Sequence, residues 1–231
     1  MEDKKVLFIQ SFSENIYDLN ALTMPNHVRY FNRHGYSFLF KNEKYDAGVF
    51  SFKSVKKYLE DYDVVVTLGC DCVITDPDVS ITGFSSNYVA VSQESAFSAR
   101  CGTYCNGEIM VFNRKDDAIF RLLDAFDEMQ LAERDEFRRN YRETPRVFYS
   151  TQSFFNNVFS GKYQHSVAFR PYVDYVGVGK LQSYLDRYTA IKVLPDEEWR
   201  PGRFLLHVFG IPNSDKIAHI EEFFGEYPEY R

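Results

Sequence analysis

The sequence lacks several features that mark common protein classes. It has no apolar run of about 18 residues, the length that a membrane-spanning helix needs. Its first residues turn polar too soon for a signal peptide. Lysine and arginine number 27 against 33 aspartate and glutamate, a net charge of −6, which disfavours sequence-independent nucleic-acid binding. We therefore expect a cytoplasmic or otherwise soluble intracellular protein that binds no nucleic acid.

Three common catalytic and phosphate-binding signatures are also absent. The chain has no GxxxxGK[ST] loop, no GxGxxG after its first predicted strand and no GxSxG turn. P-loop, dinucleotide-binding and α/β-hydrolase readings are therefore disfavoured. Tryptophan occurs once, whereas 22 phenylalanines and 17 tyrosines bring the aromatic share to 17%. We expect most phenylalanines in the core, while tyrosine-rich surfaces often line sites for flat ligands.

Cysteine is scarce, and its four residues form two sequence pairs, Cys70 with Cys72 and Cys101 with Cys105. Inside a reducing cell such thiols stay reduced. The C-x-C and C-x3-C spacings differ from the C-x2-C pairs of most structural zinc sites. Reduced thiols in the fold are therefore the main interpretation, and a zinc-stabilised interaction domain built on the four cysteines is an alternative.

What the sequence does contain is an alternation of apolar strands and amphipathic helices. Strands are predicted at residues 5–10, 36–40, 63–68, 87–92, 108–112 and 204–209. Helices are predicted at residues 19–34, 52–59, 119–129, 154–159 and 217–224, with Gly35 as the left-handed residue after the first. The charged segment 131–146 reads as a solvated helix and loop. This order predicts one α/β domain over residues 1–231, with a mainly parallel central sheet flanked by helices.

Ligands of such sheets bind where the strands end, so the residues after each strand are the candidates for chemistry. The most apolar strand, 63–68, runs directly into Gly69, Cys70 and Asp71. A carboxylate at this point is costly unless it is paired or binds a cation. His207 in a late strand and Lys216 near the start of the last helix are weaker candidates when taken alone. The first could be a core histidine or a metal ligand, and the second could meet a phosphate.

Taken in order, these segments resemble the GT-A nucleotide-sugar glycosyltransferases, especially the galactosyl, xylosyl and mannosyl group of the GMA12/MNN10 type. The stretches that carry the resemblance are residues 32–36, 52–53, 64–77, 106–113, 122–126, 151–153 and 207–210, together with Lys216. Three features depart from the pattern of that group. Gly69 stands where the first Asp of a D-x-D motif is expected, Ser150 and Thr151 replace two acidic residues, and Phe52 stands near an expected Trp.

The resemblance implies a GT-A (Rossmann-like) fold and a glycosyltransferase activity. A hexose or pentose would move from a nucleotide-diphosphate sugar, UDP- rather than GDP-linked, to a glycan or glycoconjugate acceptor with retention of configuration. Asp71 and His207 would hold Mn²⁺, or less favourably Mg²⁺. Gln152 would lie near the reacting carbon and, as a poor nucleophile, favours front-face attack. The donor-binding residues that the resemblance implies are Ser11, Lys53, Cys70, Asn106, Gly107, Gly210 and Lys216.

The missing first Asp leaves several possibilities open. Asp76 or Cys70 could compensate for it as a metal ligand, or lysine and arginine could replace the cation altogether. The chain could also be a catalytically degenerate nucleotide-sugar or glycan-binding protein of the same fold. The lack of a recognisable anchor would suit a bacterial, phage or large-virus enzyme. The sequence itself identifies neither the donor sugar nor the acceptor.

Overall fold

The structure is a computed structural model. It describes residues 4–42, 53–84, 89–93, 105–114, 119–120, 123–124, 191–192, 204–209 and 211–231. Its strands are β1 (Val6–Phe12), β2 (Ser37–Asn42), β3 (Val64–Leu68), β4 (Cys72–Ile74), β5 (Val89–Gln93), β6 (Cys105–Asn113), β7 (Ile191–Lys192) and β8 (Leu205–Phe209). The helices used below are η1 (Glu14–Ile16), α1 (Tyr17–His34), α2 (Lys53–Tyr58) and α8 (Asn213–Glu226).

Within the described residues, five strands form the central sheet, in the order β2-β1-β3-β6-β5. The pairs β2–β1 and β1–β3 are parallel, whereas β6 runs antiparallel to both of its neighbours. The unbroken valine run of β3 is buried along its whole length, as expected for a central strand covered on both faces. The predicted α/β class is confirmed. The parallel strand pairs are those among β1, β2 and β3, the first three strands of the chain.

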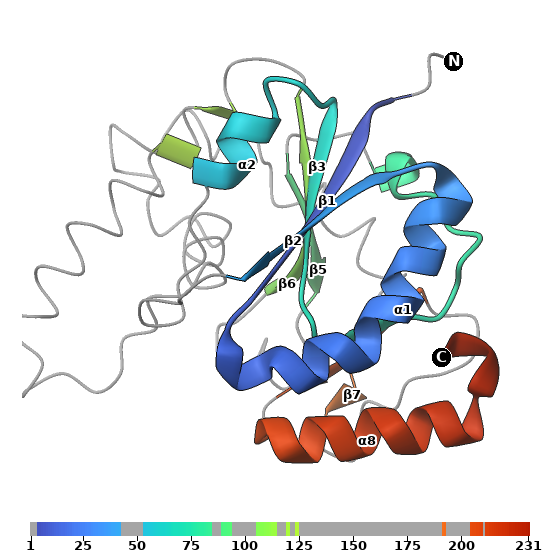
Figure 1. Cartoon of the computed structure of the whole chain (residues 1–231). Coiled ribbons are helices and arrows are strands. Elements are labelled where there is room, and N and C mark those ends of the chain that lie inside the picture. Colours follow the sequence, from blue (N-terminus) through green and yellow to red (C-terminus); the bar gives the residue numbers. More distant parts are fainter. Residues whose placement is uncertain are drawn as a thin grey trace, which may run out of the picture.

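Alternating side chains of β1 divide the apolar residues between the two faces of this sheet. Val6 and Phe8 belong to the cluster that contains the aromatic residues of α1, and the ring of Phe8 lies 4.4 Å from that of Phe31. Leu7 and Ile9 are equally buried and, by the two-residue period of a strand, face the other side. Figure 1 shows the corresponding layers, with α1 on one side of the sheet and α2 on the other.

The end of α1 follows the pattern predicted from Gly35. This glycine has a φ of +66°, in the left-handed region. The amide of Tyr36 donates to the carbonyl of Phe31 at 2.9 Å, and the amide of Gly35 donates to that of Asn32 at 3.3 Å. These two bonds form a Schellman motif, which closes the helix and turns the chain into β2.

A second, smaller sheet has the order β4-β8-β7, and of its strands the sequence predicted only β8. Strands β4 and β8 are antiparallel, with Cys72 opposite His207. Helix α8 covers this sheet, because Ile220, Phe223 and Phe224 share a buried cluster with residues of β4 and β8. Helix α8 also packs against α1, and the two lie near each other in Figure 1.

Some sequence-based expectations fall outside the described residues. The segments 131–146 and 154–159 are among them, and of the predicted helix 119–129 only two short helical pieces, at 119–120 and 123–124, are described. Within the described part of the chain, no helix is both long enough and apolar enough to cross a membrane.

Candidate metal and donor site

The register of the central sheet brings several predicted residues to one edge. Ile9 of β1, Thr67 of β3 and Met110 of β6 are neighbours across the sheet. Because β6 is antiparallel to β3, the first residues of β6 lie at the same edge of the sheet as the last residues of β1 and β3. Three groups of predicted residues therefore gather at the carboxyl edge of β1 and β3, namely Ser11, the pair Cys70 and Asp71, and the pair Asn106 and Gly107.

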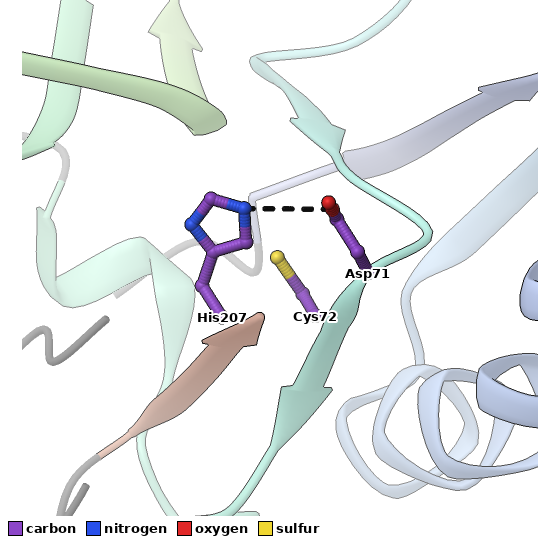
Figure 2. A group of neighbouring side chains, drawn as sticks. All are labelled: Asp71, Cys72 and His207. Atoms are coloured by element: carbon purple, nitrogen blue, oxygen red, sulfur yellow. Dashed lines mark ion pairs between the residues drawn. The ribbon is translucent and has the colours of Figure 1, made fainter. Parts of the chain in front are cut away.

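Asp71 and His207 meet because their segments pair as neighbouring strands. Asp71 immediately precedes β4, and its carbonyl accepts the amide of Val208 at 3.0 Å. The Oδ1 atom of Asp71 lies 3.5 Å from Nε2 of His207, as the dashed line in Figure 2 marks. Both side chains are buried, with exposed fractions of 7% and 3%. The carboxylate and the imidazole that the resemblance assigned to a metal are thus adjacent.

Lys216 completes this group from the first turn of α8. Its ammonium donates a hydrogen bond to Oδ2 of Asp71, the carboxylate oxygen that does not face His207. Burial would raise the pKa of Asp71, but the charges and hydrogen bonds of His207 and Lys216 outweigh it and hold that pKa well below its usual range. Asp71 is therefore ionised at neutral pH and is available as a ligand for a cation.

Helix α1 fixes the segment that carries Asp71 through three polar side chains. The residues at positions 70, 72 and 74 turn their backbone groups toward α1, while those between them turn toward β8. The bonds are Thr23 Oγ1 to Cys70 O at 2.8 Å, His27 Nε2 to Cys72 O at 2.9 Å, Asn26 Nδ2 to Ile74 O at 2.9 Å and Ile74 N to Asn26 Oδ1 at 2.7 Å. We call Thr23, Asn26 and His27 the α1 ladder, because they occupy the edge of β4 where another strand could pair.

His27, the middle rung of this ladder, is an inner residue of the fold. Its Nδ1 atom lies 2.8 Å from Oε1 of Gln10 on β1, and the Gln10 amide in turn donates to Asn20 at 3.0 Å. Burial lowers the pKa of His27 to about 4, although the Cys72 carbonyl and the Asp71 charge oppose the shift. His27 is thus neutral at physiological pH and acts as a structural support beneath Asp71 and Cys72.

Most of the other residues predicted for the site can be located in the described part of the chain. Ser11 is buried at the end of β1, and Cys70 packs with Leu206 and Val208 in the apolar cluster under α8. Asn106 and Gly107 lie on β6 and Lys53 begins α2. Gly210 and Gln152 lie outside the described residues. Asp76, the suggested compensating ligand, lies beyond the opposite end of β4, where its carboxylate accepts the amide of Asp78 at 3.1 Å.

Sequence reasoning missed Cys72 as a member of the site. Within the described residues, one group of metal-ligating side chains has its ligand atoms within 4.8 Å of one another, and it consists of Asp71, Cys72 and His207. In Figure 2 the sulfur points toward the space between the carboxylate and the imidazole. The available signal was the C-D-C sequence, but the direction of each thiol depends on the pairing of β4 with β8.

These donors fit a divalent cation. An ionised carboxylate and an imidazole are ligands of Mn²⁺ and of zinc-like ions, and a thiolate suits the softer ions of that series. Asp71 offers Oδ1 on the side of His207 while Lys216 binds Oδ2. The site can therefore present a fixed carboxylate to a cation and a fixed ammonium to an anion that binds beside it.

Comparison with known proteins identifies the fold of this chain. No family model matches the sequence, and no curated protein matches it either. Among solved structures, the chain is similar to a glycosyltransferase involved in glycosylation of the major capsid of PBCV-1. The TM-score is 0.58 at 12% identity, over 94% of this chain and 99% of that one. The chain has a GT-A fold.

Two weaker likenesses have TM-scores below 0.5. The glycosyltransferase GlyE of Streptococcus pneumoniae gives 0.46 at 12% identity, over 97% of this chain and 64% of that one. The galactosyltransferase LgtC gives 0.40 at 12% identity, over 95% of each chain. The likeness to the capsid glycosyltransferase, at 12% identity, establishes the fold alone, since one fold serves many functions. The resemblance to the galactosyl, xylosyl and mannosyl group stays a prediction.

Proposed function

We propose that this protein is a glycosyltransferase that uses a nucleotide-diphosphate sugar as its donor. The observation that carries the proposal is the junction of Asp71, His207 and Lys216 at the strand ends of a GT-A fold. A diphosphate needs positive charge beside it and cation ligands within reach, and this junction offers both. A buried ion pair with a purely structural role would need no position at the ligand-binding edge of the sheet.

The two ends of the junction have separate roles in this proposal. Asp71 and His207 would hold a divalent cation, which when bound neutralises charge on the departing diphosphate as a Lewis acid. Lys216 would bind a diphosphate oxygen through its ammonium, near the first amides of α8. The support for this role is that its ammonium already lies against a carboxylate oxygen in the structure.

The nucleoside would lie along the end of β1. Tyr17, 58% exposed, stands there with its ring 6.2 Å from that of Phe12, and Ser11 comes just before Phe12. The η1 turn beside it is connected to the start of α8, because Asn213 Nδ2 donates to Asn15 O at 3.3 Å. A nucleotide could thus reach from an aromatic face to Lys216. Stacking of a base on such a face contributes about 1–3 kcal/mol.

The transfer itself follows the resemblance, and it needs no protein base. The bond between the anomeric carbon and the diphosphate oxygen breaks, and the acceptor oxygen bonds to the same face of that carbon. The acceptor proton passes to the leaving diphosphate oxygen. Gln152 would contact the reacting sugar, and Asn106 and Gly107 would lie beside it. The donor is proposed to be UDP-linked rather than GDP-linked, carrying a hexose or pentose, and the acceptor to be a glycan.

The proposal is tested by thermal unfolding with UDP, GDP, CMP and ADP, each with and without a divalent cation. A nucleotide at 100 times its dissociation constant stabilises the folded state by about 2.7 kcal/mol, which raises the midpoint by about 5–10 °C in a chain of this size. We expect a cation-dependent rise with one nucleotide, lost in Asp71→Asn and His207→Gln. The matched control is Asp78→Asn, which removes an exposed carboxylate paired with Arg33 and should keep the full rise. No rise with any nucleotide would overturn the proposal.

A non-catalytic binding protein of the same fold is the second candidate. It is favoured by Gly69, which stands where a second site carboxylate would be, and by Ser150 and Thr151 in place of acidic residues. Slow hydrolysis of UDP-sugars to free sugar separates the two candidates, because a catalytic member transfers the sugar to water at a low rate. Binding without hydrolysis, at a level unchanged by Asp71→Asn, would favour the binding protein.

A further inference from the structure

Cys72 and His207 face each other across β4 and β8 at the closest type of position in an antiparallel pair. The amide of Val208 donates to the carbonyl of Asp71, so the residues between those bonds, Cys72 and His207, form a non-hydrogen-bonded pair. Side chains of such pairs stand on the same face with their Cβ atoms only about 4.5–5.5 Å apart. The sulfur and the imidazole are therefore held toward each other by backbone geometry.

The three ligand atoms are enclosed as well as close. Cys72 is fully buried, and its sulfur lies within 4.8 Å of the ligand atoms of Asp71 and His207. The α1 ladder holds the backbone at this point, because His27 bonds to the Cys72 carbonyl. A cation between Asp71 and His207 would thus have the sulfur as a neighbour without rearrangement of the main chain.

A thiolate at Cys72 would also supply the negative charge that is missing from the expected D-x-D motif. Gly69 removes one carboxylate from the expected D-x-D motif. A thiolate at Cys72 together with the carboxylate of Asp71 gives the ligand set two negative charges, as two carboxylates would. It restores the charge but changes the chemistry, because sulfur prefers zinc-like ions to the hard ions Mg²⁺ and Mn²⁺.

We propose that Cys72 is the third protein ligand of this metal site, and that the site selects Zn²⁺ or a similar borderline ion over Mn²⁺ and Mg²⁺. Asp71 would bind through Oδ1, His207 through Nε2 and Cys72 through its sulfur, which releases its proton to solvent as the metal–sulfur bond forms. The fourth position of a tetrahedral ion would be left for an oxygen of the diphosphate. The role of the ion beside a diphosphate rests on the proposed function, whereas binding of the ion by these three side chains does not.

Cobalt is the probe for the test, because Co²⁺ occupies zinc-type sites and absorbs in the near ultraviolet when a thiolate binds it. The protein is prepared with Cys101→Ser and Cys105→Ser, so that the other cysteine pair cannot contribute. We expect the sulfur-to-cobalt band on titration with Co²⁺, its loss in Cys72→Ser and its retention in Cys70→Ser. Cys70 is the matched control, since it is also buried, in the apolar cluster under α8, but does not belong to the group of ligand atoms formed by Asp71, Cys72 and His207.

Competition measures the preference for the ion. Zn²⁺ should displace Co²⁺ at concentrations at least about 10-fold below those that Mn²⁺ needs, following the usual order of affinities for divalent ions. The Cys72→Ser change should weaken Zn²⁺ binding by more than the about 10–100-fold typical of losing an outer contact to a ligand. Bound Co²⁺ without the sulfur band, or a band that persists in Cys72→Ser, would overturn the proposal.

X-ray absorption of the zinc-loaded protein needs no change at position 72 and covers the case in which Cys72→Ser fails to fold. One sulfur neighbour at about 2.3 Å from zinc is expected, and a shell of nitrogen and oxygen alone would refute the proposal. The two hypotheses fail separately. A sulfur ligand without binding of any nucleotide would remove the glycosyltransferase proposal and keep the metal site. Nucleotide binding that requires Asp71 but shows no sulfur ligand would do the reverse.

Discussion

Replacing Asn26 with alanine tests the α1 ladder at its most connected rung. The Asn26 side chain accepts the amide of Ile74 at 2.7 Å and donates to the carbonyls of Ile74 at 2.9 Å and Tyr230 at 2.7 Å. Alanine would leave both backbone groups of the buried Ile74 without their partner. An orphaned buried polar group costs about 1–3 kcal/mol, so we expect a loss of about 3 kcal/mol in the free energy of unfolding.

Urea unfolding measures that loss, and hydrogen exchange shows where it arises. With a slope of about 2 kcal/mol per molar urea, the midpoint should fall by more than about 1 M. The amide of Ile74 should exchange faster in Asn26→Ala, because Asn26 is its acceptor. The amide of Thr75, which donates to Phe204 O at 2.8 Å, should stay protected and serves as an internal reference.

The matched control is Asn32→Ala, which removes the same side chain from an exposed position of the same helix. It should change the free energy of unfolding by no more than about 0.5 kcal/mol. If Asn26→Ala were as mild as Asn32→Ala, or if the Ile74 amide kept its protection, helix side chains would not be what holds β4 in place, and the reasoning would be refuted.

Three further predictions concern the helix end, the buried histidine and the ion pair. Gly35→Ala should lower the free energy of unfolding by about 1–2 kcal/mol, because the φ of +66° at this position disfavours a side chain. Gly225→Ala on α8 should leave that free energy unchanged or raise it by up to about 1 kcal/mol. Equal urea midpoints for the two variants would contradict both expectations. His27 has a folded pKa of about 4 against 6.5 when unfolded, so the unfolded chain binds more protons between these values. Stability is full above about pH 6.5 and falls by about 3 kcal/mol toward pH 4, and a urea midpoint series should show this slope in the parent chain and lose it in His27→Gln. Lys216→Gln should cost about 3 kcal/mol at pH 7, because it leaves the Asp71 carboxylate buried with one cation fewer. The double variant with Asp71→Asn should recover most of that loss, and additive effects would exclude the coupling.

Sequence patterns predicted the parts of this fold that depend on local signals. The valine run of β3 marks a central strand without reference to any partner, and Gly35 marks the end of α1 because only its neighbours decide the turn. Asp71 stood out because it follows that strand directly. These predictions needed no knowledge of which distant segments pack together.

The pairing that builds the site could not be read in this way. Strand β4 has only three residues, Cys72–Ile74, which is too short for a period, and its partner β8 lies near the other end of the chain. Without that pairing, His207 taken alone could be either a core histidine or a ligand, and nothing indicated where the Cys72 side chain points. His27 reads as an ordinary polar residue of a helix, and its burial depends on the packing of α1 over β4.

The α1 ladder has a consequence for how molecules of this protein meet one another. An outermost strand usually presents a row of amides and carbonyls that can recruit a strand from another molecule. Among the described strands, β4 is outermost in its sheet, yet its outward carbonyls and the amide of Ile74 are bonded to side chains of a helix. A second chain could pair there only after α1 had left the central sheet. The strand beside Asp71 is thus protected from aggregation by sheet extension along this edge.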